Sequence, residues 1–292
     1  MPTLPPNGPS APNFAGLSMD KIQSSLHGAR LDANNTRKLE AEKRLDYYWG
    51  DQARHLEDLL KQQFKNPERM LLQLEFSNIT KEIIDQVSMV YKSHPNRVLL
   101  LNGEPAPEAQ EKIYSEMLRQ TNIDALMKVV NRFTNLLNTV GVQVVWRDNQ
   151  LQLDVITPDT FDVIQDPMLP SRAAAVLLER TFANTSNLWN DLNTVADNML
   201  TVVWTANEHM VFGTRGTPHP ELSNDQGINP YGIIPIAFFR DAYPMGWFFN
   251  QGSFDLINGQ ESLNVKLVEL NYLLKMQAFS VPVVISDQAP GS

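Results

Sequence analysis

The apolar residues of this chain change their spacing at Gly141, and this change restricts the fold more than any other feature of the sequence. Before Gly141, apolar side chains recur every three or four positions, which is the period of an amphipathic helix. After it, apolar residues such as Val142, Val144 and Trp146 occupy alternate positions, which is the period of a half-buried strand. Because helical and strand patterns occupy separate stretches, the sequence predicts an α+β fold.

Four helices are predicted in the first half of the chain, over residues 36–64, 80–94, 108–119 and 122–140. Thr36 can cap the first of them, and Gly50 and Asp51 are expected to bend it or split it in two. Pro95 is expected to end the second helix. Gly141 suits the C′ position after the fourth, where a residue often adopts a left-handed conformation.

Strands are predicted in most of the second half. Residues 142–147 and 151–155 form a hairpin pattern, and Asp148-Asn149 offers the turn. Further strands are expected over 161–164, 200–205, 209–213 and 233–239, with Pro235 at a sheet edge or strand end. Residues 174–182 favour a strand, although their alanines leave a helix open. Residues 184–197 are expected to form an inserted loop or short helix, and residues 214–232 a loop.

The last element is a long helix over about 253–279, roughly 40 Å in length at 1.5 Å per residue. Ser253 can cap it, and Asp255 suits its N-terminal dipole. A leucine stripe follows a near-heptad pattern and consists of Leu256, Leu263, Leu267, Leu270 and Leu274. This spacing suits packing against another helix, including one of a neighbouring subunit, or against the chain's own sheet.

Composition excludes several classes of protein. The 292 residues include 24 Lys and Arg against 33 Asp and Glu, a net charge of -9, which argues against a protein that coats nucleic acid. There is no cysteine, so disulfides, thiolate metal sites and a cysteine nucleophile are excluded. The apolar runs are too short to span a membrane, and we expect a soluble protein. Residues 1–33 are rich in proline near their start and predict a disordered arm.

Sequence motifs for catalysis are mostly missing. The zinc-protease, nucleophile-elbow, phosphate-loop and dinucleotide-binding motifs do not occur. Asp159, Asp162 and Asp166 form a loose carboxylate cluster, and His219 lies between two prolines. An α+β metal-dependent enzyme built on these residues is one hypothesis, although turn formation by aspartate explains the cluster equally well. The sequence therefore favours a structural or assembly role.

Four segments carry further information through their residues and their order. They are Arg37–Asp51, with two adjacent tyrosines before a tryptophan and a glycine, then Asn78–Val87, Ile156–Asp166 and Asn229–Phe239. The long helix and the run Val281–Ile285 follow them. In this order, the segments resemble the portal proteins of tailed bacteriophages, the head–tail connector family.

The resemblance implies a portal wing, helical and then β-rich, followed by a long stem helix. It assigns residues 34–140 to the helical part of the wing, 141–250 to its β-rich part, 251–279 to the stem helix and 280–292 to the start of a clip-like segment, after an arm at 1–33. The family's second stem helix, channel loop and crown have no counterpart in this sequence.

The resemblance also implies a function. Portal subunits form a ring of about twelve copies at one capsid vertex, through which double-stranded DNA is packaged and ejected. The implied partners are further copies of the chain, the major capsid and scaffold proteins, the terminase large subunit and a head–tail adaptor. The implied location is the virion, after assembly in the host bacterial cytoplasm. Neither enzymatic activity nor a cofactor is implied, and another minor virion protein is a further alternative.

The polar face of the long helix holds the candidate site residues, which are Glu261, Lys266, Glu269 and Lys275. A channel must let DNA slide, and tight neutralisation of phosphates would hold it instead. A net negative charge with a few lysines fits a channel wall. Ion pairs between neighbouring subunits are an equal alternative for these four residues.

Overall fold

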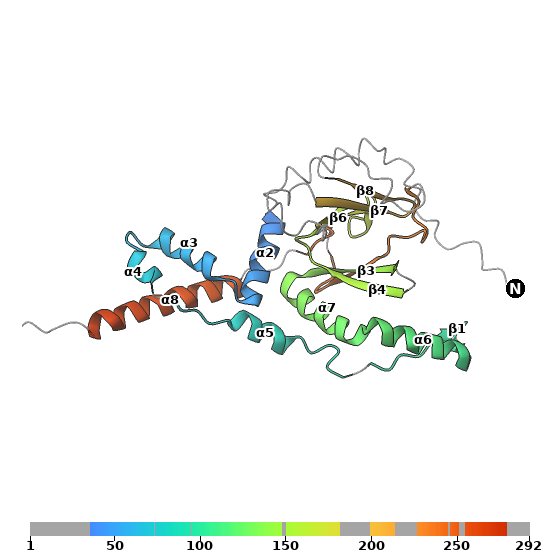
Figure 1. Cartoon of the computed structure of the whole chain (residues 1–292), viewed down its shortest axis with the longest axis horizontal. Helices are drawn as coiled ribbons and strands as arrows, with labels where there is room; N and C mark the ends of the chain where they lie inside the picture. The colour runs from blue at the N-terminus through green and yellow to red at the C-terminus, as the bar shows by residue number, and fades with distance from the viewer. Residues whose placement is uncertain are drawn as a thin grey trace, which may run out of the picture. The chain divides into compact units, whose positions relative to one another are not determined.

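The computed structural model describes residues 36–72, 74–93, 95–147, 150–181, 199–213, 227–244, 246–250 and 255–278 (Figure 1). This part of the chain is a mixture of helices and sheets, which is compatible with the predicted α+β class. The expected arm at 1–33, the 184–197 segment, His219 and the clip-like segment at 280–292 lie outside the described residues. No helix among the described residues has both the length and the apolar character needed to cross a membrane.

The helices mostly follow the predicted ranges. They are α2 (Thr36–Trp49), α3 (Ala53–Gln63), α4 (Glu68–Leu71), α5 (Ile79–Val87), α6 (Glu108–Thr121), α7 (Ile123–Leu137) and α8 (Asp255–Ala278). The predicted break after α2 is confirmed, and Gly50 adopts a φ of 91° there, which favours glycine. The expectation that the second helix continues to Pro95 is wrong, because α5 ends at Val87. The next residue, Ser88, instead accepts a 3.0 Å hydrogen bond from the Asn135 amide of α7.

Within the described ranges, the strands form three antiparallel sheets. Strands β1 (Leu100–Leu101) and β2 (Glu104–Pro105) pair in a small hairpin that periodicity did not predict. A three-stranded sheet has the order β4-β3-β9, from β3 (Thr139–Arg147), β4 (Gln150–Ile156) and β9 (Ile236–Arg240). A four-stranded sheet has the order β5-β6-β7-β8, from β5 (Phe161–Gln165), β6 (Ala173–Thr181), β7 (Met199–Thr205) and β8 (His209–Phe212). Pro235 immediately precedes the edge strand β9, as predicted.

The contacts of the chain define two compact units, and these do not follow the predicted division into a helical and a β-rich part. The first unit contains the described residues up to Glu42 and from Val87 to Asn250. The second contains Lys43–Gln86 and helix α8. The reason is that α7 packs on the sheet that follows it, whereas α3 and α4 pack on α8, which is far away in the sequence.

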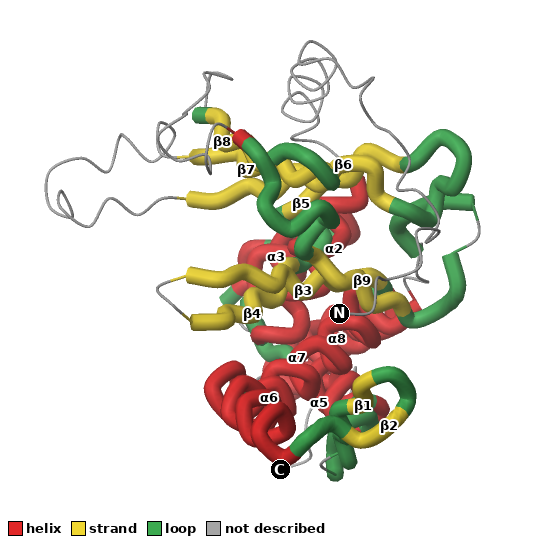
Figure 2. The backbone as a smooth tube through the Cα atoms, turned by 90° about the vertical axis from the view of Figure 1, so that its right-hand side faces the viewer, coloured by secondary structure: helices red, strands yellow, loops and turns green. Residues whose placement is uncertain are grey.

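The first unit has three layers, which Figure 2 shows as the four-stranded sheet, the three-stranded sheet and helix α7. Apolar side chains of both sheets meet in one core cluster that includes Ile156, Phe161 and Ile236. The opposite face of the three-stranded sheet packs on α7, where Met127 and Val130 contact Val142. This sheet is therefore covered on both faces, whereas the alternation in the sequence predicted a half-buried strand.

Gly141 lies inside strand β3, so the prediction that it is the C′ residue of the preceding helix is wrong. Asn138 takes that role with a φ of 64°, and its N–H donates a 2.9 Å hydrogen bond to the Thr134 carbonyl. Gly141 is instead the register partner of Ile156 on one side and Phe238 on the other. The glycine is needed for close approach of a side chain and not for a left-handed conformation.

The second unit contains a helical core. Leu56 and Leu60 of α3 and Met70 of α4 pack against Val265 and Val268 of α8. Full burial of an aliphatic side chain contributes about 1.5–3 kcal/mol to stability, so this small cluster holds α8 against α3 and α4.

Candidate functional site

Helix α8 carries all four residues predicted as site residues, and the structure separates Glu261 from the other three. The Glu261 side chain is only 13% exposed, and it forms a 2.5 Å ion pair with Lys43. The Tyr47 hydroxyl donates a 3.0 Å hydrogen bond to the same carboxylate oxygen. Glu261 is therefore paired within its own chain, which sequence spacing did not predict.

Tyr47 is an unusual partner because it is almost completely buried, with an exposed fraction of 1%. Burial, and then the nearby Glu261 carboxylate, raise the pKa of the Tyr47 hydroxyl far above its ordinary value. The hydroxyl stays protonated and remains a donor to Glu261. The tyrosine ring also stacks on His55, with ring centroids 5.6 Å apart. This cluster fixes the N-terminal half of α8 against α2.

Lys266 and Glu269 lie at the surface of α8, beside a shallow hollow of about 370 Å³. Its other lining residues come from α3 and from α8 itself, and they are Leu59, Gln63, Asn258, Glu261, Ser262 and Val265. Lys275 lies in the last turn of α8, where a cation interacts favourably with the helix dipole. Among the described residues, no ion pair involves Lys266, Glu269 or Lys275. Whether they face a channel or a neighbouring subunit stays a prediction.

The leucine stripe of α8 is not the face that this unit buries. The buried row of α8 consists of Ile257, Gln260, Asn264, Val265 and Val268. At roughly 100° per residue, the centre of this row lies about 100° around the helix from the leucine stripe. Leu270 and Leu274 remain 51% and 53% exposed. The alternative that this stripe packs on the chain's own sheet stays a prediction, because the sheets belong to the first unit.

Three buried amides were missed in the sequence, namely Gln52, Gln260 and Asn264. Asn264 donates to Gln52 at 3.0 Å, and Gln260 donates to Asn264 at 2.9 Å. Gln260 and Asn264 are four residues apart and so lie on one line of a helix. The sequence does carry a signal for this buried row. The two amides lie between the apolar residues Ile257 and Val268, on a face of the helix that is less hydrophobic than the leucine stripe.

Two of the three aspartates of the metal-enzyme hypothesis have structural roles, whereas one buried carboxylate oxygen of Asp159 has no hydrogen-bond partner in the described part of the chain. Asp162 forms ion pairs with Arg37 at 2.5 Å and with Lys38 at 2.6 Å. Asp166 accepts a 2.9 Å hydrogen bond from the backbone N–H two residues ahead, as in an Asx-turn. Within the described ranges, no group of three or more histidine or acidic side chains is arranged to hold a metal ion.

Arg37 connects the start of α2 to the sheets of the first unit. Its guanidinium lies 3.9 Å from the centre of the Phe249 ring and donates a 3.2 Å hydrogen bond to the Phe161 carbonyl. Burial lowers the pKa of Arg37, and the neighbouring carboxylates of Asp162 and Asp159 oppose this effect. The group is a structural anchor whose charge is compensated locally.

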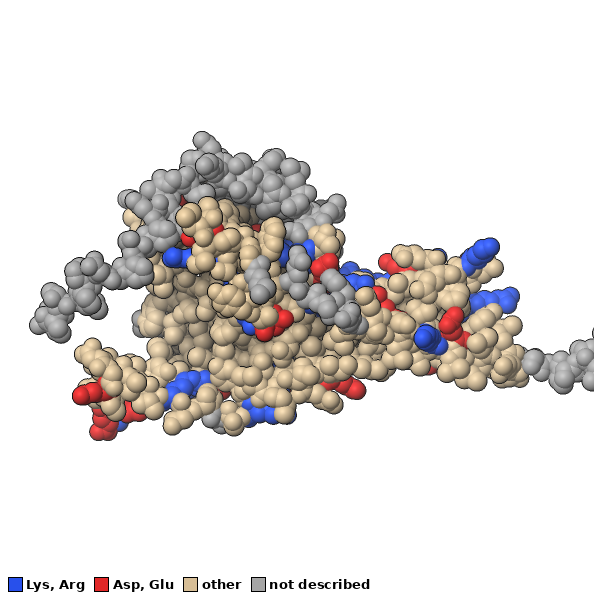
Figure 3. Space-filling model, turned by 180° about the vertical axis from the view of Figure 1, so that it is seen from behind, with Lys and Arg blue, Asp and Glu red and all other residues tan. Residues whose placement is uncertain are grey.

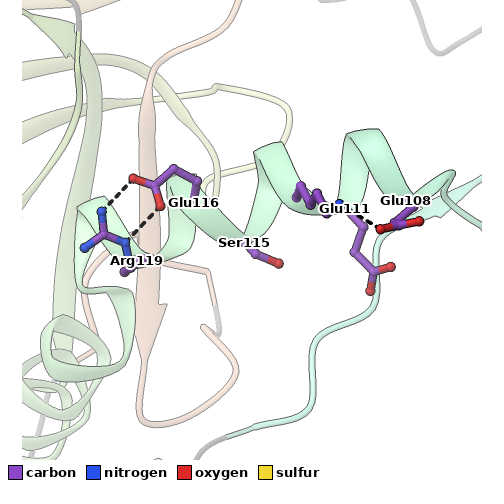
Figure 4. A pocket seen from close by; sticks show the side chains of 6 residues that line it. Glu108, Glu111, Ser115, Glu116 and Arg119 are labelled. Carbon is purple, nitrogen blue, oxygen red and sulfur yellow. Dashed lines mark hydrogen bonds and ion pairs between the residues drawn. The ribbon is translucent and has the colours of Figure 1, made fainter.

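A second hollow, of about 360 Å³, lies along one face of α6 (Figure 4). Its walls are exposed side chains of a single helix. Lys112 pairs with Glu108 at 2.7 Å, and Arg119 pairs with Glu116 at 2.7 Å. Hydrogen bonds from Arg119 and Gln120 lower the pKa of Glu116 to about 2. These are neighbouring pairs on a solvated helix, and they offer no enclosed site for a reaction.

The charged side chains of the described residues are scattered over the face seen in Figure 3, where acidic and basic groups alternate without a broad basic patch. No family model matches this sequence, and no curated protein matches it either.

Proposed function

We propose that this chain is a structural subunit of a bacteriophage portal, which forms a ring at one capsid vertex and lets double-stranded DNA pass during packaging and ejection. The observation that carries the proposal is the occurrence of four portal-like segments in the family's order along the sequence. The location of these segments in the structure supports it. They lie on α2, on α5, on the end of β4 with β5, and on the approach to β9.

Distinctive residues of these segments occupy positions where the fold needs them. The Asn229 amide is buried and donates hydrogen bonds of 2.7 Å to the Thr205 carbonyl and 2.8 Å to the Ile233 carbonyl. Gly232 in the same turn has a φ of 65°, which favours glycine. Asn78 caps α5 by accepting a 3.1 Å hydrogen bond from the N–H of Lys81. The resemblance therefore includes residues that define local structure.

Helix α8 is the proposed stem helix. Its 24 residues give it a length of about 36 Å. Leu263, Leu267, Leu270 and Leu274 alternate at spacings of four and three, which is the pattern of a helix that packs along another helix. Because this stripe is not the buried row of α8, we assign its C-terminal part to the contact with a second copy of the chain.

The net negative charge of the chain fits a channel through which DNA slides better than a protein that binds DNA tightly. A protein that neutralises many phosphates binds DNA tightly, and the affinity falls steeply with salt. A net charge of -9 and mixed surface charges give little such attraction. In this proposal the ring surrounds the duplex, while the terminase large subunit drives it and a head–tail adaptor, capsid and scaffold proteins contact the ring from outside.

The oligomeric state of the purified protein tests the proposal. Light scattering during size-exclusion chromatography and negative-stain electron microscopy should show rings, and about twelve copies of this 33.0 kDa chain would give a mass near 400 kDa. The variant Leu270→Asp/Leu274→Asp should give smaller species. Leu72→Asp is the matched control, because Leu72 is exposed in the same unit but lies outside α8.

The outcomes separate the alternatives. A monomer at all concentrations, also when expressed from the complete reading frame, would contradict the portal proposal. Rings that survive the double substitution would reject the leucine stripe as the contact and leave the portal function standing. Localisation of the protein at many capsid sites would favour another minor virion protein. A metal that co-purifies and is required for stability would favour the enzyme hypothesis.

DNA binding provides an independent test. We expect weak binding of double-stranded DNA, with a shallow dependence of the affinity on salt concentration. Titration of labelled duplex at several salt concentrations, followed by fluorescence anisotropy, measures both quantities. Tight binding with a steep salt dependence would show that the protein grips DNA and would refute the proposed passage.

A further inference from the structure

The buried amides of the second unit form one fully paired network. The side chains of Gln52, Gln260 and Asn264 are 0%, 4% and 1% exposed. The Gln260 amide group donates to Asn264 at 2.9 Å and to the Ser77 carbonyl at 2.5 Å. Asn264 in turn donates to Gln52 at 3.0 Å and accepts a 3.3 Å hydrogen bond from the Ser77 N–H. Buried amides are tolerated when paired in this way.

The same network caps helix α5. The Gln260 side-chain oxygen accepts hydrogen bonds from the N–H of Ile79 at 2.9 Å and of Thr80 at 3.1 Å. These are the first two residues of α5, whose N–H groups have no partner within the helix. Gln260 therefore uses both of its donor hydrogens and both oxygen lone pairs. Three of these four hydrogen bonds, with Ser77, Ile79 and Thr80, fix its position relative to the start of α5.

Apolar burial alone would favour a different rotation of α8. The leucine stripe holds five leucines, whereas the buried row holds two amides and three aliphatic side chains. A rotation of about 100° would bring the leucine stripe inward. It would also remove Gln260 and Asn264 from their partners and leave the N–H groups of Ile79 and Thr80 unpaired. Unpaired buried polar groups are costly, so the network opposes this rotation.

We propose that the amide network of Gln52, Gln260 and Asn264 is a rotational lock, which holds α8 in one orientation and keeps its leucine stripe outward. Buried polar groups fix the register of helices in this way where purely apolar contacts would allow several settings. The lock acts within one chain and does not depend on the proposed ring.

The accessibility of one engineered thiol tests the lock, because the chain has no cysteine of its own. Val268 is fully buried in the observed orientation, and Ser262 is exposed on the same helix. The reaction of Val268→Cys with a thiol reagent should be at least about tenfold slower than that of Ser262→Cys. Adding Gln260→Leu and Asn264→Leu should abolish most of this protection while the helix content by circular dichroism is retained.

The matched control is Asn258→Leu, which makes the same kind of change at an exposed position of α8 and should leave Val268→Cys protected. If the double leucine variant does not fold, Asn264→Ala alone is measured with the same two thiols. Unchanged protection of Val268→Cys in the folded lock variant would overturn the proposal. A loss of protection that Asn258→Leu reproduces would also overturn it, since any leucine on α8 would then have the same effect. Whether the protein forms rings tests only the portal function and does not test the rotational lock.

Discussion

Replacement of Gly141 by alanine is expected to destabilise the first unit, because the structure leaves no room for a side chain at this position. A Cβ atom on Gly141 would lie 2.5 Å from Cγ1 and 2.7 Å from Cδ1 of Ile156, and 3.2 Å from Cγ2 of Ile236. Carbon atoms in contact are normally about 3.5–4.0 Å apart. Both isoleucines belong to the core between the two sheets, so neither can move away freely.

The magnitude follows from two opposing effects. Overpacking of a core costs about 1–3 kcal/mol. Alanine also restricts the unfolded chain more than glycine does, which offsets about 0.4–1 kcal/mol. We expect a net loss of roughly 1–2 kcal/mol, which corresponds to a Tm about 3–6 °C lower for a unit of this size. Gly259→Ala is the control, because a Cβ there meets nothing within 4 Å and should stabilise α8.

Thermal and urea unfolding, followed by circular dichroism, measure the effect. The companion variant Ile156→Val removes Cδ1, the methyl group that would lie 2.7 Å from the new Cβ, and keeps Cγ1. The double variant Gly141→Ala/Ile156→Val should therefore lose less free energy of unfolding than the two single variants together, by about 0.5 kcal/mol or more. A Gly141→Ala protein as stable as the wild type, or strict additivity, would refute the close approach. Tolerance of Gly141→Asn would instead favour a helix C′ role.

Three further predictions concern the polar groups of both units. Tyr47→Phe should lower the free energy of unfolding by about 1.5 kcal/mol, since it removes a donor to the charged Glu261, and an unchanged urea midpoint would contradict this. Arg37→Met should lower the Tm measurably, whereas Arg119→Ala on exposed α6 should leave it within error; equal effects would reject the anchoring role of Arg37. Burial lowers the pKa of His209 below 6.5, so the folded state binds fewer protons than the unfolded state, and stability should be full above pH 6.5 and fall as the pH drops through the folded pKa. His209→Phe should flatten this part of the pH profile of the urea midpoint, and an unchanged slope would assign the effect to other groups.

Most elements of the fold could be predicted because their signals are local. The hairpin of β3 and β4 and the split between α2 and α3 follow from the alternation of apolar residues and from Gly50. The β1–β2 hairpin was also predictable, since Asn102-Gly103 is a strong signal for a two-residue turn, and both residues have positive φ values. Its omission reflects its two-residue strands, which are too short to show periodicity.

The candidate site was predictable only in part. Spacing places Lys266, Glu269 and Lys275 on the polar surface of a long helix, and they do lie at its surface. The same spacing cannot reveal that Glu261 pairs with Lys43 and Tyr47, which are more than two hundred residues away in the sequence. Pairing between distant residues depends on which helices become neighbours, and periodicity carries no information about that.

The sequence alone determined the fold class, the position and type of nearly all elements, and the existence of a long final helix with a leucine stripe. These properties depend on backbone preferences and on hydrophobic spacing within one segment. The tertiary structure decided which face of α8 is buried and why Gly141 must be a glycine. Both depend on atoms from distant segments, because hydrogen bonds to Gln260 and Asn264 outweigh the apolar pattern, and a cross-strand isoleucine fills the space where a side chain would stand.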